Sequence, residues 1–204
     1  MIFAWEESRT AFADAARWYV ETTALVGNRW DQPGLGEWDI RGLVGHTSRS
    51  LLTVEAYLAV PPAAVEVATA ADYVRSIRAA AAGPGALERG RAAAEALGPD
   101  PAPAVAEIAR RVLALVDTCD GSELLTSLVG GMTLRDYLPT RTFELAVHTC
   151  DLTVALGLPA QVPPSAAVQA LAVICDVVAH GGDAAALLLA TTGRRPLPAG
   201  YSVL

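Results

Sequence analysis

Apolar residues recur at steps of three and four along most of the chain, which is the spacing of helices that bury one face. Alanine is the commonest residue and β-branched runs are short, which also favours helix over strand. We therefore expect a mainly all-α fold. The helices that the spacing predicts cover about 5–26, 39–60, 69–82, 86–97, 104–117, 139–157 and 164–192, the last broken at Gly181–Gly182.

Residues that favour caps and turns set the expected boundaries of two of these helices. Asp39 is a good N-cap, and Trp38 before it is expected to staple the helix entry to the core. Thr133 and Asp136 resemble a capping box, yet Pro139 would then lie deep inside the helix. We therefore expect either a short turn before this helix or a start near Pro139. Residues 124–134 are expected to be extended, because two glycines interrupt any helix there.

Composition and charge narrow the class of protein. Hydrophobic residues make up 52% of the 204 and charged residues 18%, which is enough apolar material for one domain with a core and excludes global disorder. The net charge is −7 and no basic run exceeds two residues, so we expect no nucleic-acid and no membrane partner. The first residues carry no basic run, so we expect no leader segment, and we expect no apolar run near the length that crosses a bilayer. The expected location is cytoplasmic.

One helix carries a pattern with chemical meaning. Apart from two threonines, the only residues of 143–157 that are not apolar or glycine are Glu144, His148 and Asp151. These three are four and three residues apart and so lie on a single stripe of the helix. A carboxylate among apolar neighbours costs several kcal/mol unless a charge or a metal satisfies it. We therefore predict a divalent cation held by Glu144 and His148.

A third ligand must come from another segment, and only two other histidines exist. His46 is the better candidate, because it lies beside the inward stripe of an amphipathic helix, whereas His180 precedes Gly181–Gly182 near a helix end. Two histidines and one carboxylate form the set that zinc enzymes use when one position stays open, and nickel and iron also accept it. Cys150 lies about 240° around the helix from Glu144 and is not expected to be a ligand.

Two segments resemble a known family. Residues 36–46, with Trp38 and His46, are similar to the Trp-x-x-x-x-Leu-Val-x-His segment of the mycothiol-dependent maleylpyruvate isomerase metal-binding domain. Residues 141–152 resemble its Arg-x-x-Glu-x-x-x-His-x-x-Asp run. The resemblance covers about residues 5–160. It implies a DinB/YfiT-like four-helix bundle, with short additional helices and an irregular C-terminal tail, that binds zinc or another divalent ion.

The resemblance also implies roles and boundaries. It supports His46, Glu144 and His148 as metal ligands, and it suggests that Asp151 and Arg141 assist them as residues of the catalytic site. Residues 1–160 would form the metal-binding bundle. We expect residues 161–204 to form a helical extension packed on it rather than the separate α/β domain of the fully characterised isomerase type.

Three functions follow as hypotheses. The first is an isomerase or S-transferase that activates mycothiol, or another low-molecular-weight thiol, at an open Zn²⁺, Ni²⁺ or Fe²⁺ site for addition to a small electrophilic substrate. The second is a non-catalytic metal-binding bundle, whose site a fourth protein ligand would close. The third is a metal-dependent hydrolase with Asp151 as general base. Tyr137 is expected in the interior or at the rim, where it could donate a proton. A homodimer is also expected to be possible.

Overall fold

The computed structural model describes residues 3–81 and 84–203 and is mainly helical, as the sequence predicts. Four short strands form two separate antiparallel pairs. The helices are α1 (Trp5–Ala24), α2 (Ile40–Leu58), α3 (Ala70–Ala81), α4 (Pro84–Ala96), α5 (Pro101–Val116), α6 (Leu134–Leu156), α7 (Pro164–Gly181) and α8 (Ala184–Thr191). The strands are β1 (Pro33–Leu35), β2 (Trp38–Asp39), β3 (Leu124–Ser127) and β4 (Gly130–Thr133).

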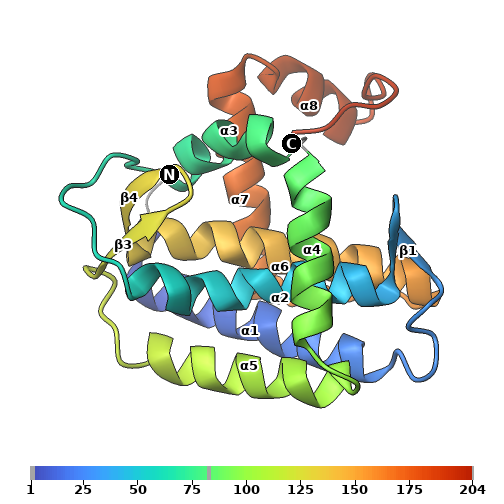
Figure 1. Ribbon diagram of the computed structural model, residues 1–204. Helices are drawn as coiled ribbons and strands as arrows, with labels where there is room; N and C mark the ends of the chain where they lie inside the picture. Colours follow the sequence, from blue (N-terminus) through green and yellow to red (C-terminus); the bar gives the residue numbers. More distant parts are fainter. Residues whose placement is uncertain (1–2, 82–83, 204) are drawn as a thin grey trace.

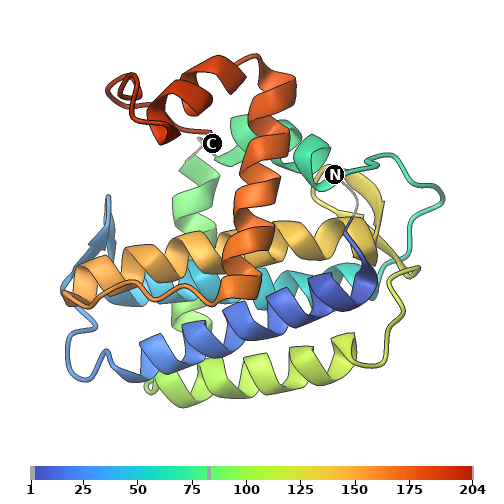
Figure 2. The same ribbon diagram turned by 180° about the vertical axis from the view of Figure 1, so that it is seen from behind.

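Four long helices, α1, α2, α5 and α6, lie side by side as a bundle (Figure 1). The colour gradient shows that α1 and α6 run in one direction and α2 and α5 in the other, so α2 and α6 are antiparallel neighbours. Helix α4 crosses α2 on one side of the bundle, and α7 crosses α6 and α1 on the opposite side (Figure 2). The antiparallel pairing brings the first half of α2 beside the second half of α6.

The predicted inward stripes form the core. Phe12 and Tyr19 of α1 and Leu43 and Leu51 of α2 are fully buried. The Tyr19 hydroxyl donates to the carbonyl oxygen of Val44 at 2.7 Å and so ties α1 to α2 inside the bundle. Because both stripes face the same interior, the spacing of apolar residues correctly indicates which face of each helix is buried.

The expected start of the predicted helix over 139–157 was wrong. Helix α6 begins at Leu134 with Thr133 as its N-cap, and Pro139 lies inside the helix. The Thr133 hydroxyl accepts from the Asp136 amide at 3.3 Å and donates to the Asp136 carboxylate at 2.6 Å. This cap, together with full burial of Tyr137 and Leu138, offsets the backbone hydrogen bond that Pro139 cannot donate. Helix α5 likewise begins at Pro101, earlier than expected, because proline fits the first turn.

Two hairpins flank the bundle helices. Strands β3 and β4 pair within the segment expected to be extended, with Leu125 opposite Met132. Strands β1 and β2 were not predicted, and they lead directly into α2. Asp39 is the N-cap of α2, as predicted, and its carboxylate accepts from the Gly42 amide at 2.6 Å.

Helix α7 corrects the expectation about apolar runs. Its 18 residues reach a mean hydropathy of 1.3, so it is long and apolar enough to cross a membrane by length and composition alone, and a third of it is buried in the structure. It packs against α6 and α1, and Gly182 ends it in the left-handed conformation. The extension after the bundle therefore contacts the bundle through α7, while Val168 and Leu171 remain exposed.

Candidate metal centre

Helix α6 supplies three of the four polar side chains at the centre. Glu144 and His148 are one turn apart, and their side chains are only 15% and 13% exposed. The Glu144 Oε2 atom lies 3.2 Å from the His148 Nε2 atom. The other ring nitrogen of His148, Nδ1, lies 3.0 Å from an Asp151 carboxylate oxygen. The predicted stripe therefore forms a chain in which His148 is held between two carboxylates.

Helix α2 supplies His46 from the facing side. The indole of Trp38 stacks on the His46 ring, with 4.3 Å between ring centroids and 31° between planes. The Trp38 indole lies against Gly42 and Gly90, where a Cβ atom would approach its ring to 3.2 and 3.0 Å. Trp38 thus does more than staple the helix entry, because it also fixes one face of the His46 ring.

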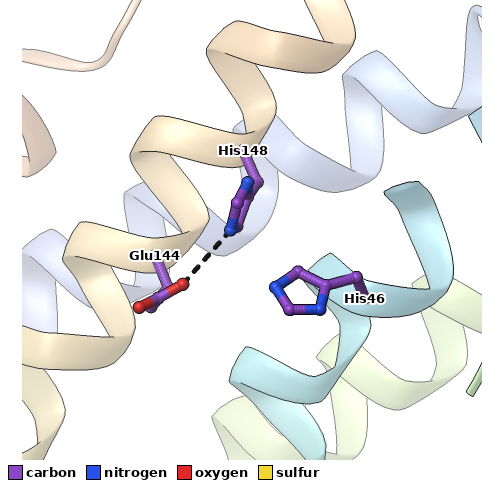
Figure 3. A group of neighbouring side chains, drawn as sticks. All are labelled: His46, Glu144 and His148. Atoms are coloured by element: carbon purple, nitrogen blue, oxygen red, sulfur yellow. Dashed lines mark ion pairs between the residues drawn. The ribbon is translucent and has the colours of Figure 1, made fainter. Parts of the chain in front are cut away.

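The structure brings His46, Glu144 and His148 together, as the sequence predicts. Each offers one ligand atom, and these atoms all lie within 4.8 Å of one another. Figure 3 shows a ring nitrogen of His46 pointing from α2 toward the pair on α6. The rings of His46 and His148 meet edge to face, with centroids 4.8 Å apart. No other such group of His, Cys, Asp or Glu occurs in the parts of the chain that the structure describes.

The donor set fits a divalent cation. Ligand bonds of about 2.0–2.2 Å place neighbouring donors roughly 3.3–3.6 Å apart around a tetrahedral ion, close to the 3.2 Å between Glu144 and His148. His46 Nδ1 is buried and has no hydrogen-bond partner among the described residues. That these residues bind a metal remains a prediction.

Burial and neighbouring charges set the protonation states of the three side chains. Burial, together with the nearby His148, lowers the pKa of His46 to about 4. Burial also disfavours the charged forms of Glu144 and His148, but their hydrogen bonds outweigh this effect on the pKa of each. The bonds to Asp151 and Glu144 raise the pKa of His148 to about 9, and the bond from His148, aided by Arg141, lowers the pKa of Glu144 to about 2. At neutral pH, the protein without metal therefore holds His46 neutral and Glu144 and His148 charged.

Arg141 lies one turn before Glu144 but makes no ion pair with it among the described residues. Its side chain is buried, and its guanidinium lies over the rings of Tyr137 and Tyr73, 4.8 and 5.2 Å from their centroids. Its Nη2 atom is buried and has no hydrogen-bond partner within the described part of the chain. Arg141 thus acts on Glu144 through its charge rather than by contact, and its assisting role remains a prediction.

The remaining candidate residues lie away from the three ligand atoms. Tyr137 is fully buried and donates to the Thr53 hydroxyl at 2.8 Å, so it is an interior residue and not a group at the mouth of the site. His180 is exposed and contacts Asp176 on its own helix. Cys150 is free and outside the group of three.

Sequence reasoning missed the tyrosines around Arg141. Tyr73 lies on α3, within a segment whose helical pattern is weak, and Tyr57 follows the inward stripe of α2. Tyr73 and Tyr57 each lie within 5.6 Å of the Tyr137 ring, measured between centroids. Three aromatic residues from three helices share no local spacing, so no signal in the sequence marks them as one cluster.

A comparison with protein families gives one match. The family model described as the mycothiol maleylpyruvate isomerase N-terminal domain matches residues 12–153, which include all three residues of the cluster and Asp151. No curated protein and no solved structure gives a significant match. The match covers more than half of the chain and agrees with the helical bundle and the His/Glu/His cluster, and the chain therefore belongs to the mycothiol maleylpyruvate isomerase N-terminal domain family.

Proposed function

We propose that this protein is a thiol-dependent isomerase or S-transferase with an open divalent metal site, zinc being the first choice of ion. His46, Glu144 and His148 would hold the ion, and mycothiol or a similar low-molecular-weight thiol would be the cofactor. The observation that carries the proposal is the convergence of two imidazoles and one carboxylate within 4.8 Å. Membership of a mycothiol-related family supports the choice of thiol.

The absence of a fourth protein ligand favours an enzyme over a structural metal site. Structural zinc sites are closed by four protein ligands, whereas catalytic sites keep three and leave a position for substrate. Among the described residues, no fourth His, Cys, Asp or Glu adds a ligand atom to the group formed by His46, Glu144 and His148, since the Asp151 carboxylate contacts the other ring nitrogen of His148. This observation supports a catalytic role over a bundle that the metal only stabilises.

Each residue has a defined task in the proposal. When bound, the ion would lower the pKa of a thiol so that its thiolate forms near neutral pH. Asp151 accepts a hydrogen bond from His148 Nδ1 and so leaves Nε2, which faces Glu144, as the nitrogen that would bind the ion. Trp38 holds the His46 ring in place and excludes water from one of its faces. Glu144 stays ionised because its pKa is lowered to about 2.

Metal analysis and a spectroscopic titration test the proposal. We expect the purified protein to bind about one ion per chain, and His46→Ala and His148→Ala to lose it, while His180→Ala, on α7 and outside the cluster, keeps it. In the cobalt-substituted protein, a low-molecular-weight thiol should produce a sulfur-to-cobalt charge-transfer band. Full metal content in both cluster variants would overturn the site, and the absence of the band with any thiol would overturn the thiol-dependent function.

A further inference from the structure

Helix α7 carries a second apolar stripe that the protein does not bury. Its inward stripe, which includes Val173 and Val177, packs against the bundle, and α7 lies on the outside of the bundle (Figure 2). The residues on its outward side follow one another at steps of four and three and are all exposed and uncharged: Pro164, Val168, Leu171, Cys175 and Ala179. Such steps place the five side chains on one narrow stripe of the helix. Val168 and Leu171 are 68% and 59% exposed, so large apolar side chains face solvent.

Helix α8 extends this apolar surface. It follows α7 directly and contacts it, and apart from Thr191 at its end it consists of alanine and leucine. None of its residues is buried, and Leu188 is 65% exposed. A helix that is apolar on every side normally lies in the interior of a protein or of a membrane. We call the outward stripe of α7 and the exposed side chains of α8 together the α7–α8 face. Within the part of the chain that the structure describes, nothing covers this face.

The accessible surface of the protein indicates how large the missing cover is. The protein exposes 9999 Å². A compact monomer of 21.2 kDa is expected to expose about 9,100 Å². The difference of about 900 Å² is close to the roughly 800 Å² that each partner buries in a stable complex of standard size. The surplus surface is therefore as large as one side of a dimer interface.

The chemistry of the α7–α8 face favours a second copy of this chain over a membrane. Helices that lie on a membrane surface carry Lys or Arg on their polar side, whereas α7 and α8 contain neither. The net charge of −7 would also repel the protein from anionic lipids. In a two-fold dimer the same face of each copy meets the other, so a charged face would place like charges together, and an uncharged face avoids this cost. Steps of three and four are also the spacing at which the side chains of two helices interlock.

We propose that the α7–α8 face binds a second copy of this chain and forms a two-fold symmetric dimer, in which the two α7 helices lie against each other. The two Cys175 side chains, one from each copy, then lie within the interface because Cys175 is part of the outward stripe. Helix α7 crosses α6 on the side of the bundle opposite α4, so the interface leaves α2 and His46 uncovered. The inference is therefore independent of the function proposed above, and the dimer and the metal site are tested separately.

Analytical ultracentrifugation over a range of protein concentrations tests the dimer. We expect the wild type to sediment with twice the 21.2 kDa mass of the chain. Leu171→Glu places two like charges in the middle of the interface and should raise the dissociation constant of the dimer at least about a hundredfold. Val60→Glu is the matched control, since Val60 is 55% exposed just after α2, and it should leave the dimer intact. Thermal unfolding checks that each variant is folded, and the metal content of Leu171→Glu should equal that of the wild type.

Cross-linking then locates the interface. Cys175 is exposed, whereas Cys119 and Cys150 are partly buried. Bismaleimidohexane should therefore join two chains of the wild type, and Cys175→Ser should remove the cross-linked species. A wild type that stays monomeric at every concentration, or a dimer that persists unchanged in Leu171→Glu, would refute the inference. Equal dissociation in Val60→Glu would refute it too. A monomer that binds vesicles of phosphatidylcholine would assign the α7–α8 face to a membrane instead and would likewise exclude the dimer.

Discussion

The two halves of the candidate metal centre are built in different ways. On α6, Glu144, His148 and Asp151 lie within two turns of one helix and are joined by hydrogen bonds of 3.0–3.2 Å. On α2, His46 makes no hydrogen bond through Nδ1 to any residue that the structure describes, and the Trp38 indole stacks on its ring. One half is therefore ordered by local polar bonds and the other by packing between distant segments. Different substitutions should accordingly damage the two halves.

Removal of one histidine from each half should give the largest contrast. Both His148→Ala and His46→Ala lose a ligand and should reduce metal affinity by at least about a hundredfold. In the metal-free protein, however, His148→Ala leaves the Glu144 carboxylate buried without its partner and should destabilise the fold by roughly 3 kcal/mol. His46→Ala removes packing against Trp38 but no polar bond and should cost less. Urea unfolding after removal of metal by a chelator measures both values. Equal losses of stability would mean that the two halves are held in the same way.

The packing that carries His46 can be broken without touching a ligand. A Cβ atom at Gly45 would overlap the backbone nitrogen and the Cα atom of Ala94 on α4, so Gly45→Ala must push α4 away from α2. We expect a loss of about 2 kcal/mol in the free energy of unfolding, together with weaker metal binding, because His46 is the next residue. Gly181→Ala is the matched control, since a Cβ atom there meets nothing within 4 Å, and it should be neutral or slightly stabilising. A normal metal affinity in Gly45→Ala would show that α4 does not help to place His46.

The same contrast explains how much the sequence alone could predict. The α6 half follows from spacing, because residues four and three apart on one helix must share a stripe whatever the rest of the fold does. The place of His46 opposite that stripe follows less directly, from the scarcity of histidines and the amphipathic pattern of α2. Both features could be predicted because long helices repeat one pattern many times.

Contacts that depend on single residues could not be predicted. The slot for Trp38 exists because glycines of α2 and α4 leave room for an indole, and no periodicity signals it. Strands of two or three residues, such as β1 and β2, are too short for an alternating pattern. Pro139 argued for a later start of α6, but the Thr133 cap and the burial of Tyr137 outweighed the usual effect of proline.

The pH dependence should differ in sign between the two histidines. The pKa of His148 is raised to about 9. Protonated His148 therefore contributes fully to the stability of the metal-free fold below pH 6.5, and this contribution is lost as the pH rises through 9. His46 has its pKa lowered to about 4, so its contribution is present above 6.5 and is lost as the pH falls through 4. The measurement is the free energy of unfolding of the metal-free protein at several pH values, for the wild type, His46→Ala and His148→Ala. The loss of stability at alkaline pH should disappear in His148→Ala, and the loss at acidic pH should disappear in His46→Ala.

The number of protons released on metal binding tests the protonation states of the three side chains. Between pH 4 and 9 the ion must displace one proton, from His148, since His46 is already neutral and Glu144 already ionised. Affinity should therefore rise about tenfold per pH unit, with about one proton released at pH 7. Calorimetry in two buffers with different ionisation enthalpies gives the number of protons. A release near zero or near two would contradict the assigned protonation states.

The smallest effect should come from Asp151→Asn, which keeps an oxygen acceptor near His148 Nδ1 but removes its charge. Above pH 9, where His148 has lost its proton in the wild type too, the variant should bind metal about tenfold more weakly, because the imidazole becomes a poorer donor. At pH 7 the loss of affinity should be smaller. Removal of the Asp151 charge lowers the pKa of His148, so a smaller fraction of His148 carries the proton that the metal must displace. Asp176→Asn, beside the exposed His180, is the control and should change neither value. A loss that is larger at pH 7 than above pH 9 would mean that Asp151 does not act by holding a proton on His148.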